Sequence, residues 1–436
     1  MLPIELVTLL IVGGILVSLV LGVPLAFASG AIAVGLTVHG FGPDALMLIS
    51  SRTFSFLDSY ILVSVPLFIL MASILERSGL ARDLYTALSA WSGRVPGGVG
   101  AVTVLVGVVL AATVGVIGGE IVVLGLVALP QLLRLGYQRR LAIGTICASG
   151  SLGTMIPPSV ILVFYGLTAN VGIGDLFLAT LLPGLLLAAL YIGYVLLRCR
   201  IDPSLGPPPP GHRALPLAER LALLRGVALP LAVAATVLGS IYLGIASVTE
   251  SAGIGVAGTV LACWVRGELS LTLIREAALQ TMSTCGVVLW LVLGTNALIG
   301  VYNLMGGIAY AQSLLRDLPL PPLGIVLTMV SVWVLMGMFI DWIGIMLLTM
   351  PIFVPTITAL GYDPLWFGIL FNIAMQIAYL TPPFAPAAFY LKGVAPEGMT
   401  LEEILGAMWP FIGLQVVALG LVIAFPGIAL WLPRGG

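Results

Sequence analysis

The chain carries the same unusual arrangement of residues twice, 225 positions apart. Two adjacent-proline pairs, Pro157-Pro158 and Pro382-Pro383, each lie inside a long hydrophobic stretch, and the two stretches align without a gap. Other residues also recur at this spacing, among them Pro130, Leu135, Gly136, Tyr137, Phe164 and Tyr165, which return as Pro355, Leu360, Gly361, Tyr362, Phe389 and Tyr390. Because proline lacks an N–H and clashes with the carbonyl one turn earlier, each pair predicts a broken helix. Duplicated broken membrane helices are typical of secondary transporters, whose substrate and ion sites lie where the backbone unwinds.

The composition places these stretches in a membrane. Of 436 residues, 60% are hydrophobic and 8% are charged, whereas soluble domains carry about 25% charged residues. At about 20 apolar residues per crossing, the chain has room for roughly ten to twelve spans. A net charge of −1 argues against nucleic acid as a partner. We therefore expect an all-α polytopic membrane protein in a lipid bilayer, with no organic cofactor.

The two copies are expected to have opposite orientations. Residues 198–225 form a proline-rich segment with five arginines, which predicts a cytoplasmic linker. The loop after Pro130 also carries arginines and is expected on that side. The equivalent loop after Pro355 carries only Asp363 and is expected in the periplasm. These assignments make the repeat inverted.

This reading divides the chain into a first repeat, a linker and a second repeat. We predict a first repeat over residues 1–197, with scaffold helices, an amphipathic helix near 76–94, a hairpin near 99–128 and a broken helix at 141–166. The second repeat, 226–436, is predicted to contain a hairpin near 321–360 and a broken helix at 365–391. The apolar face of the amphipathic helix would lie in the membrane interface or contact a partner subunit.

The first proline pair lies in a segment rich in glycine and hydroxyl side chains. The candidate ligand residues here are Ser149, Gly150, Ser151, Gly153, Thr154, Pro157, Pro158 and Ser159. Backbone carbonyls freed by the break, together with the hydroxyls, suit a hard cation such as sodium, and exposed N–H groups of the outgoing half-helix suit a carboxylate. The alternative is a proline kink whose polar groups are satisfied by neighbouring serines. The second break offers Thr381 beside Pro382 and Pro383, so its ligands would be mostly backbone carbonyls.

A glycine-rich interruption containing an acid precedes each break. The candidates are Thr113, Gly115, Gly118, Gly119 and Glu120 in the first copy, and Gly337, Asp341 and Gly344 in the second. A charge within a hydrophobic stretch costs several kcal/mol unless it is paired or hydrated, so each acid is a site candidate. Each interruption also predicts a re-entrant hairpin. The alternative is an acid at a hairpin tip that reaches water and contacts no ligand.

Two other acidic motifs are interpreted differently. Glu250 follows a serine at a helix start, which favours a capping role over a substrate contact. Asp175 and Asp363 resemble the aspartates of presenilin-like proteases, but their order is reversed and both lie between spans. We therefore disfavour an intramembrane protease.

Longer motifs resemble the large, DctM-like membrane subunit of tripartite ATP-independent periplasmic (TRAP) transporters. The matching segments are Arg-Leu-Gly-Tyr137, Gly-Ser-Leu-Gly-Thr-Met-Ile-Pro-Pro-Ser159, Ile-Gly-Asp-Leu-Phe-Leu-Ala-Thr-Leu-Leu-Pro-Gly184, Gly-Met-Phe-Ile-Asp341 and Leu-Thr-Pro-Pro383, with a weaker match at Val65-Pro-Leu-Phe-Ile-Leu. The resemblance covers most of the chain. One departure is the first hairpin tip, which has only Thr113 where the family often has a run of serines.

The resemblance implies a secondary importer in a bacterial inner membrane, driven by a sodium gradient. It also implies an elevator mechanism, a small four-helix membrane subunit, a periplasmic solute-binding protein and an organic-acid substrate. On that pattern residues 112–120 and 336–344 would be hairpin tips. The departure at the first tip leaves a proton possible as the coupling ion.

Four other functions are considered, and one of them is favoured over the rest. The main rival is a stand-alone transporter of the same superfamily that needs no binding protein. An ATP-driven permease is disfavoured because the chain lacks a Walker A motif, and a membrane enzyme because it lacks a catalytic Ser/His pair. An anchoring protein is disfavoured because it would not need two broken helices.

Overall fold

The computed structural model describes residues 2–91, 95–115, 118–209, 219 and 225–435. Across these residues the regular secondary structure consists of helices, and no strand occurs. The prediction of an all-α chain is confirmed for the described residues.

The first half of the chain ends with a long helix before the predicted linker. Its α-helices are α1 (Ile4–Val20), α2 (Leu25–Phe41), α3 (Leu46–Leu57), α4 (Ser64–Arg77), α5 (Leu80–Ser89), α6 (Gly98–Val114), α7 (Gly119–Arg134), α8 (Arg139–Ser151), α9 (Val160–Ala169) and α10 (Ile173–Ile201). Short 3-10 helices lie at η1 (Pro43–Ala45), η2 (Tyr60–Val63), η3 (Leu152–Thr154) and η4 (Pro203–Leu205).

The second half contains the longest helix. Its helices are α12 (Arg225–Tyr242), α13 (Val248–Val265), α14 (Leu271–Leu304), α15 (Gly307–Arg316), α16 (Pro322–Gly337), α17 (Trp342–Ala359), α18 (Pro364–Leu380), α19 (Pro386–Val394), α20 (Leu401–Ala424) and α21 (Gly427–Leu430).

Six helical segments are long and apolar enough to cross a membrane. They are Tyr60–Arg77, Ile173–Ile201, Val248–Val265, Leu271–Leu304, Trp342–Ala359 and Leu401–Ala424. Large apolar side chains also lie on the outside, where Val20 and Leu271 are 87% and 85% exposed. Such a surface is stable against lipid and not against water. The protein is therefore a multi-pass membrane protein.

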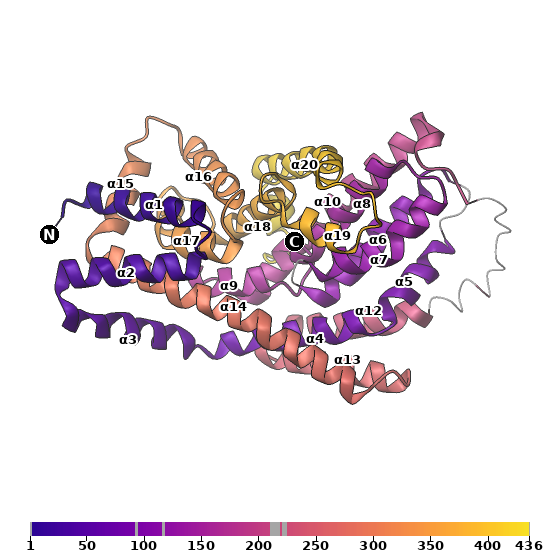
Figure 1. Cartoon of the computed structure of the whole chain (residues 1–436), viewed down its shortest axis with the longest axis horizontal. Helices are drawn as coiled ribbons and strands as arrows, with labels where there is room; N and C mark the ends of the chain where they lie inside the picture. The colour runs from indigo at the N-terminus through magenta and orange to yellow at the C-terminus, as the bar shows by residue number, and fades with distance from the viewer. Residues whose placement is uncertain (1, 92–94, 116–117, 210–218, 220–224, 436) are drawn as a thin grey trace.

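The helices form two groups. In the outer layer, α14 runs along α2, α3 and α4, and α4 also packs on α13 (Figure 1). In the central bundle, α8 packs on α6, α7 and α20, while α18 packs on α16 and α20. Helices α9 and α17 contact each other, and α17 also contacts α14. The central bundle contains both proline pairs, so the candidate site lies away from the outer ends of the molecule.

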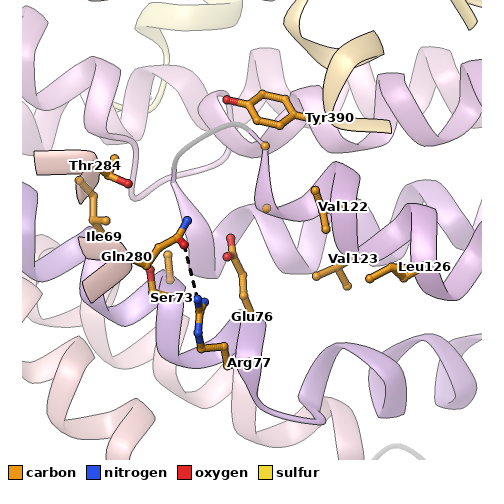
Figure 2. A pocket seen from close by; sticks show the side chains of 13 residues that line it. Ile69, Ser73, Glu76, Arg77, Val122, Val123, Leu126, Gln280, Thr284 and Tyr390 are labelled. Carbon is orange, nitrogen blue, oxygen red and sulfur yellow. Dashed lines mark hydrogen bonds between the residues drawn. The ribbon is translucent and has the colours of Figure 1, made fainter. Parts of the chain in front are cut away.

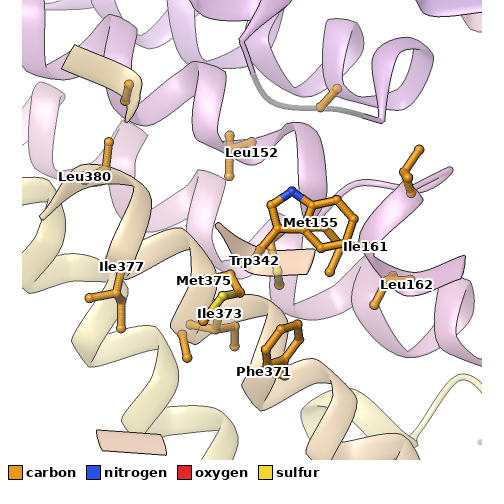
Figure 3. Packing of buried hydrophobic residues seen from close by; sticks show 14 of the residues in the cluster. Leu152, Met155, Ile161, Leu162, Trp342, Phe371, Ile373, Met375, Ile377 and Leu380 are labelled. Atoms are coloured by element: carbon orange, nitrogen blue, oxygen red, sulfur yellow. The ribbon is translucent and has the colours of Figure 1, made fainter. Parts of the chain in front are cut away.

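Aromatic and aliphatic side chains from both halves pack together in the central bundle. Trp342 lies beside Met155 and Ile161 from the first half (Figure 3), and its ring meets Phe164 edge-to-face with centroids 5.8 Å apart. Trp333 is fully buried and packs on Phe367, with centroids 4.6 Å apart. Within a membrane, packing of this kind stabilises helix contacts mainly through van der Waals interactions. This packing joins the two halves around the candidate site.

The segments predicted to be amphipathic and cytoplasmic are partly described. Helix α5 occupies the predicted amphipathic segment and packs on α6 and α12. Leu84 is fully buried there, whereas Trp91 is 41% exposed. The predicted linker begins inside α10 and continues through η4. Residues 210–218 and 220–224 of that linker lie outside the described residues.

Candidate functional site

The first proline pair interrupts a helix in the middle of the central bundle. Helix α8 ends at Ser151, the short helix η3 follows, and α9 begins at Val160. Ser159 has an extended backbone (φ −127°, ψ 125°). Two adjacent prolines remove two N–H donors to the carbonyls of the preceding turn and clash with that turn, which favours a break at this point. The break predicted from the sequence is present.

The turn of the first hairpin lies directly against this break. Helices α6 and α7 form the hairpin, and the N–H of Val160 donates to the carbonyl of Gly115 at 3.1 Å. Gly115 has φ +65°, and a Cβ added there would overlap the carbonyl oxygen of Pro158. Only glycine combines this conformation with so close an approach. The hydrogen bond therefore brings the predicted tip and the predicted break into one site.

Glu120 lies at this contact with no hydrogen-bond partner. Its side chain is 1% exposed, and both carboxylate oxygens lack a partner among the described residues. A Cβ added to Gly153 would overlap Oε1 of Glu120, so the carboxylate lies directly over that glycine. Buried polar groups almost always have partners, and an exception calls for an explanation such as an unseen ion or water.

Most of the predicted hydroxyl ligands hydrogen-bond within their own helices. Thr113 donates to the Leu110 carbonyl at 2.7 Å, and Ser149 donates to the Thr145 carbonyl at 2.5 Å. Ser159 differs, because its buried hydroxyl has no partner among the described residues. In the described part of the chain, the first site thus contains three buried side-chain oxygens without a hydrogen-bond partner, two on Glu120 and one on Ser159. Donating hydroxyls keep lone pairs that can still bind a cation.

The second proline pair also ends a helix. Helix α18 stops at Leu380 and α19 starts at Pro386. Between them Ala385, which is fully buried, has φ +33°, a left-handed conformation that non-glycine residues seldom adopt. Thr381 donates to the Ile377 carbonyl at 2.6 Å.

The turn of the second hairpin lies against this second break. Helices α16 and α17 form the hairpin, and a Cβ added to Gly337 would overlap Ala378 of α18. Asp341 caps α17 by accepting the N–H of Ile343 at 3.0 Å. A small cavity of about 20 Å³, lined by Gly337, Asp341, Tyr379 and Phe384 among others, separates turn and break. Gly344 faces Leu25 of α2 and does not join this site.

A buried polar network joins the two halves beside the first break. Ser151 donates to Oε1 of Gln376 at 3.2 Å, and Nε2 of Gln376 donates to the hydroxyl of Thr154 at 3.0 Å. Nδ2 of Asn372 donates to the Thr154 carbonyl at 2.8 Å, and Nε2 of Gln415 lies 3.4 Å from the Ser151 hydroxyl. These bonds fix the end of α8 and the short helix η3 against α18 and α20.

The sequence analysis missed the amides of this network. Asn372, Gln376 and Gln415 are fully buried, and the signal that could have found them is a polar residue inside an apolar run. Ser151 and Gln376 are separated by 225 positions, which is the spacing of the duplication. Contacts between equivalent residues occur where a two-fold axis passes.

A larger cavity lies between the first hairpin and the outer layer. Its volume is about 450 Å³, and Glu76, Arg77, Gly118, Gly119 and Tyr390 are among the lining residues. Glu76 extends from α4 toward the hairpin turn, and Tyr390 lies on the other side of that turn (Figure 2). The sequence analysis placed Glu76 in the amphipathic segment and did not treat it as a site residue. The sequence signal that could have identified Glu76 as a site residue is its place as an acid at the end of an apolar run.

The prediction that Glu250 caps a helix is confirmed. Ser247 is the N-cap of α13, its hydroxyl accepts the N–H of Glu250 at 3.3 Å, and Oε2 of Glu250 accepts the N–H of Ser247 at 2.7 Å. This reciprocal capping box satisfies both side chains without a ligand. Among the described residues no group of three or more His, Cys, Asp or Glu side chains could hold a metal ion.

The fold is similar to that of a solved membrane transporter. The structure of the Alcanivorax borkumensis YdaH transporter, which has an unusual topology, superposes with a TM-score of 0.66 at 16% identity, covering 99% of this chain and 100% of that one. At this identity the similarity concerns the fold alone.

Proteins related by sequence give a more specific assignment than the fold does. The C4-dicarboxylate TRAP transporter large permease protein DctM of Pseudomonas aeruginosa is 28% identical over 400 residues, covering 92% of each chain. The isethionate TRAP transporter permease protein DctMQ of Oleidesulfovibrio alaskensis is 26% identical over 421 residues, covering 95% of this chain and 64% of that protein. Residues 12–428 match the family model described as "Tripartite ATP-independent periplasmic transporter, DctM component". The chain therefore belongs to the DctM family of tripartite ATP-independent periplasmic transporter components.

Proposed function

We propose that this protein is the large permease subunit of a secondary transporter that imports a small organic anion with a cation. The observation that carries the proposal is the first site, where a hairpin turn meets a broken helix, and where the side-chain oxygens of Glu120 and Ser159 have no hydrogen-bond partner among the described residues. Open backbone and unpartnered oxygens in a membrane are the features that ion and substrate sites require.

The substrate would bind between the two breaks through backbone N–H groups. Helix α9 begins at Val160 and α19 at Pro386, each within three residues of a proline pair, and helix N-termini attract anions. The relatives whose names mention C4-dicarboxylates and isethionate carry organic anions, which supports the same class here. A carboxylate is the anion that we propose.

Sodium is the proposed coupling ion. It prefers oxygen ligands, which the backbone carbonyls, Ser159 and Glu120 of the first site would supply. Sodium bound there would offset the cost of burying a carboxylate without a partner. The second site would supply carbonyls of the Thr381–Pro383 segment. We further propose that the hairpins and broken helices move together against the outer layer in an elevator-type cycle.

The proposed partners are a small four-helix membrane subunit and a periplasmic solute-binding protein, with the complex in a bacterial inner membrane. A relative named DctMQ joins two components in one chain, which supports a membrane partner for this chain. Its exposed apolar outer surface offers room for such a subunit.

Uptake by reconstituted vesicles tests this proposal. The chain and its small subunit would be placed in proteoliposomes with a radiolabelled C4-dicarboxylate outside, with and without the binding protein and an inward sodium gradient. We expect uptake only when all three proteins and the gradient are present. Equal uptake without the binding protein would favour a stand-alone transporter, and ATP-dependent uptake would exclude secondary transport.

A further inference from the structure

A cavity lies at the end of the molecule where α8 and α20 begin and α10 ends. Its volume is about 210 Å³, and its wall includes Arg140 from the first turn of α8, Arg198 from the last turn of α10 and Pro410 of α20. Pockets that enclose a drug-sized ligand have about 300–1,000 Å³, so this cavity suits one small group. Among the described residues, none that lines it belongs to either hairpin–break site.

The positive charge of the two arginines in the cavity wall is only partly balanced. Within the described part of the chain, neither Arg140 nor Arg198 forms an ion pair. Glu403, an acid at the start of α20, lies 3.0 Å from the guanidinium of Arg139. Asp202 interacts electrostatically with Arg198, but it also caps η4. The charge that faces the cavity is therefore positive, which attracts an anion.

Uncharged hydrogen-bond donors lie beside the arginines. Gln138 and Tyr194 also line the cavity, and the ring of Tyr194 meets Phe411 edge-to-face with centroids 5.3 Å apart. Tyr194 interacts electrostatically with Arg198. A guanidinium can donate two parallel N–H groups to a phosphate, and an amide and a phenol each add further donors. This set of donors from two helices suits the oxygens of a phosphate group.

The cavity lies at the level where two membrane spans end. Helices α10 and α20 are both long and apolar enough to cross a membrane. Leu197 and Ile201, which flank Arg198 in the sequence, are exposed, and so is Trp409. Trp409 is the residue before Pro410 of the cavity wall. Tryptophan and basic side chains at the ends of spans are typical of the interface between lipid tails and headgroups.

From this arrangement we propose that the cavity binds the phosphate group of an anionic phospholipid. Arg140 and Arg198 hold the phosphate oxygens, and the acyl chains lie along Leu197 and Trp409. The bound lipid connects the first turn of α8, which leads to the first break, with α10 and α20. Basic pockets between membrane helices bind anionic headgroups through this chemistry. The inference depends neither on the transported substrate nor on the coupling ion.

Native mass spectrometry of the full chain tests the site without requiring transport. The protein in a nonionic detergent would be titrated with phosphatidylglycerol, with zwitterionic phosphatidylcholine of the same acyl chains, and with glycerol 3-phosphate, which carries the phosphate without the chains. We expect phosphatidylglycerol to bind at least about tenfold more tightly than the other two, because it alone combines a net negative charge with apolar contact. Equal binding of phosphatidylcholine would overturn the role of the arginines, and equal binding of glycerol 3-phosphate would overturn the lipid as the occupant.

Charge variants locate the bound lipid. R140Q and R198Q each remove one guanidinium, so each should weaken phosphatidylglycerol binding by about tenfold, as expected for the loss of a charge-assisted contact. R200Q is the matched control, because Arg200 is an exposed arginine on α10 that does not line the cavity. It should change the binding by less than about twofold. E402Q removes an exposed acid at the start of α20 and should not weaken the binding.

The variants can also refute the site. Unchanged binding in both R140Q and R198Q would remove the cavity as the lipid site. A loss in R200Q as large as that in R198Q would overturn the proposal as well, because the lipid would then respond to the general positive charge at this end of the protein. All of the substituted side chains are exposed, so the variants should fold, and equal thermal unfolding temperatures without added lipid check this.

Discussion

The two hairpin–break sites share a backbone plan and differ in their side chains. In each, a helical hairpin turns against a helix that is interrupted at a proline pair. In the first, Glu120 is buried, and both of its carboxylate oxygens lack a hydrogen-bond partner within the part of the chain that the structure describes. In the second, Asp341 accepts the N–H of Ile343 and caps α17. The two sites therefore share the opening of the backbone, while their acids have different surroundings.

The positions of the acids support this reading. At the 225-residue spacing, Glu120 corresponds to Ile345 and Asp341 corresponds to Val116, so neither acid has an acidic counterpart. The hydroxyls are also uneven, because the first break carries Ser149, Ser151, Thr154 and Ser159, whereas the second carries Thr381. Chemistry that depends on side-chain oxygens is therefore expected mainly at the first site.

The largest loss of transport should come from substitutions that close either helix break. Replacing Pro157 and Pro158 with alanines restores two N–H groups and permits a continuous helix, and the same holds for Pro382 and Pro383. If both sites act through open backbone, each double variant should reduce vesicle uptake to background. The control is P351A, because Pro351 lies within the unbroken helix α17 and should retain most uptake.

Full activity in one double variant and not in the other would change the comparison. It would show that only one of the two breaks binds substrate or ion, and that the other is a structural kink.

The second-largest loss of transport should come from neutralising either of the two acids, Glu120 or Asp341. E120Q removes the charge at the first site, and we expect uptake to fall at least about tenfold, which corresponds to about 1.4 kcal/mol. D341N keeps an acceptor oxygen for the Ile343 N–H, so the cap survives and uptake should fall less. Initial rates of dicarboxylate uptake measure both, with E402Q as the matched control. An equal or larger loss in D341N would contradict the assignment of side-chain chemistry to the first site.

A smaller effect, on stability, should come from the polar network between the halves. N372L leaves the Thr154 carbonyl without its amide donor, and Q376L removes the amide donor to the Thr154 hydroxyl. An unsatisfied buried polar group costs about 1–3 kcal/mol, so both variants should lower the thermal unfolding temperature in detergent. T358V removes an exposed hydroxyl that bonds within its own helix and should change stability by less than about 0.5 kcal/mol.

The sequence predicted the backbone of the sites better than their side chains. Proline pairs and glycines act locally through missing N–H groups and permitted φ angles, so the breaks and turns could be placed from residues such as Pro157 and Gly115. Glu76 and Gln376 act through contacts with distant segments, and no local pattern gives their partners. The 1-197 and 226-436 repeats, their inverted orientation and the elevator motion stay predictions, although the Ser151–Gln376 contact across the repeat spacing supports a two-fold relation.

The smallest effect concerns the backbone at the second break, where Ala385 is left-handed and the equivalent residue, Val160, begins a regular helix. A385G should relieve about 1–2 kcal/mol of left-handed strain and lose about 0.8 kcal/mol of methyl burial, leaving a small net gain in stability. A387G, two residues into the same environment and equally buried, loses its methyl and about 1 kcal/mol of helix propensity. Thermal unfolding should therefore rank A385G above A387G by about 2–3 kcal/mol. The reverse order would mean that the second break does not hold Ala385 in a strained conformation, and that the two breaks differ less in backbone than in side chains.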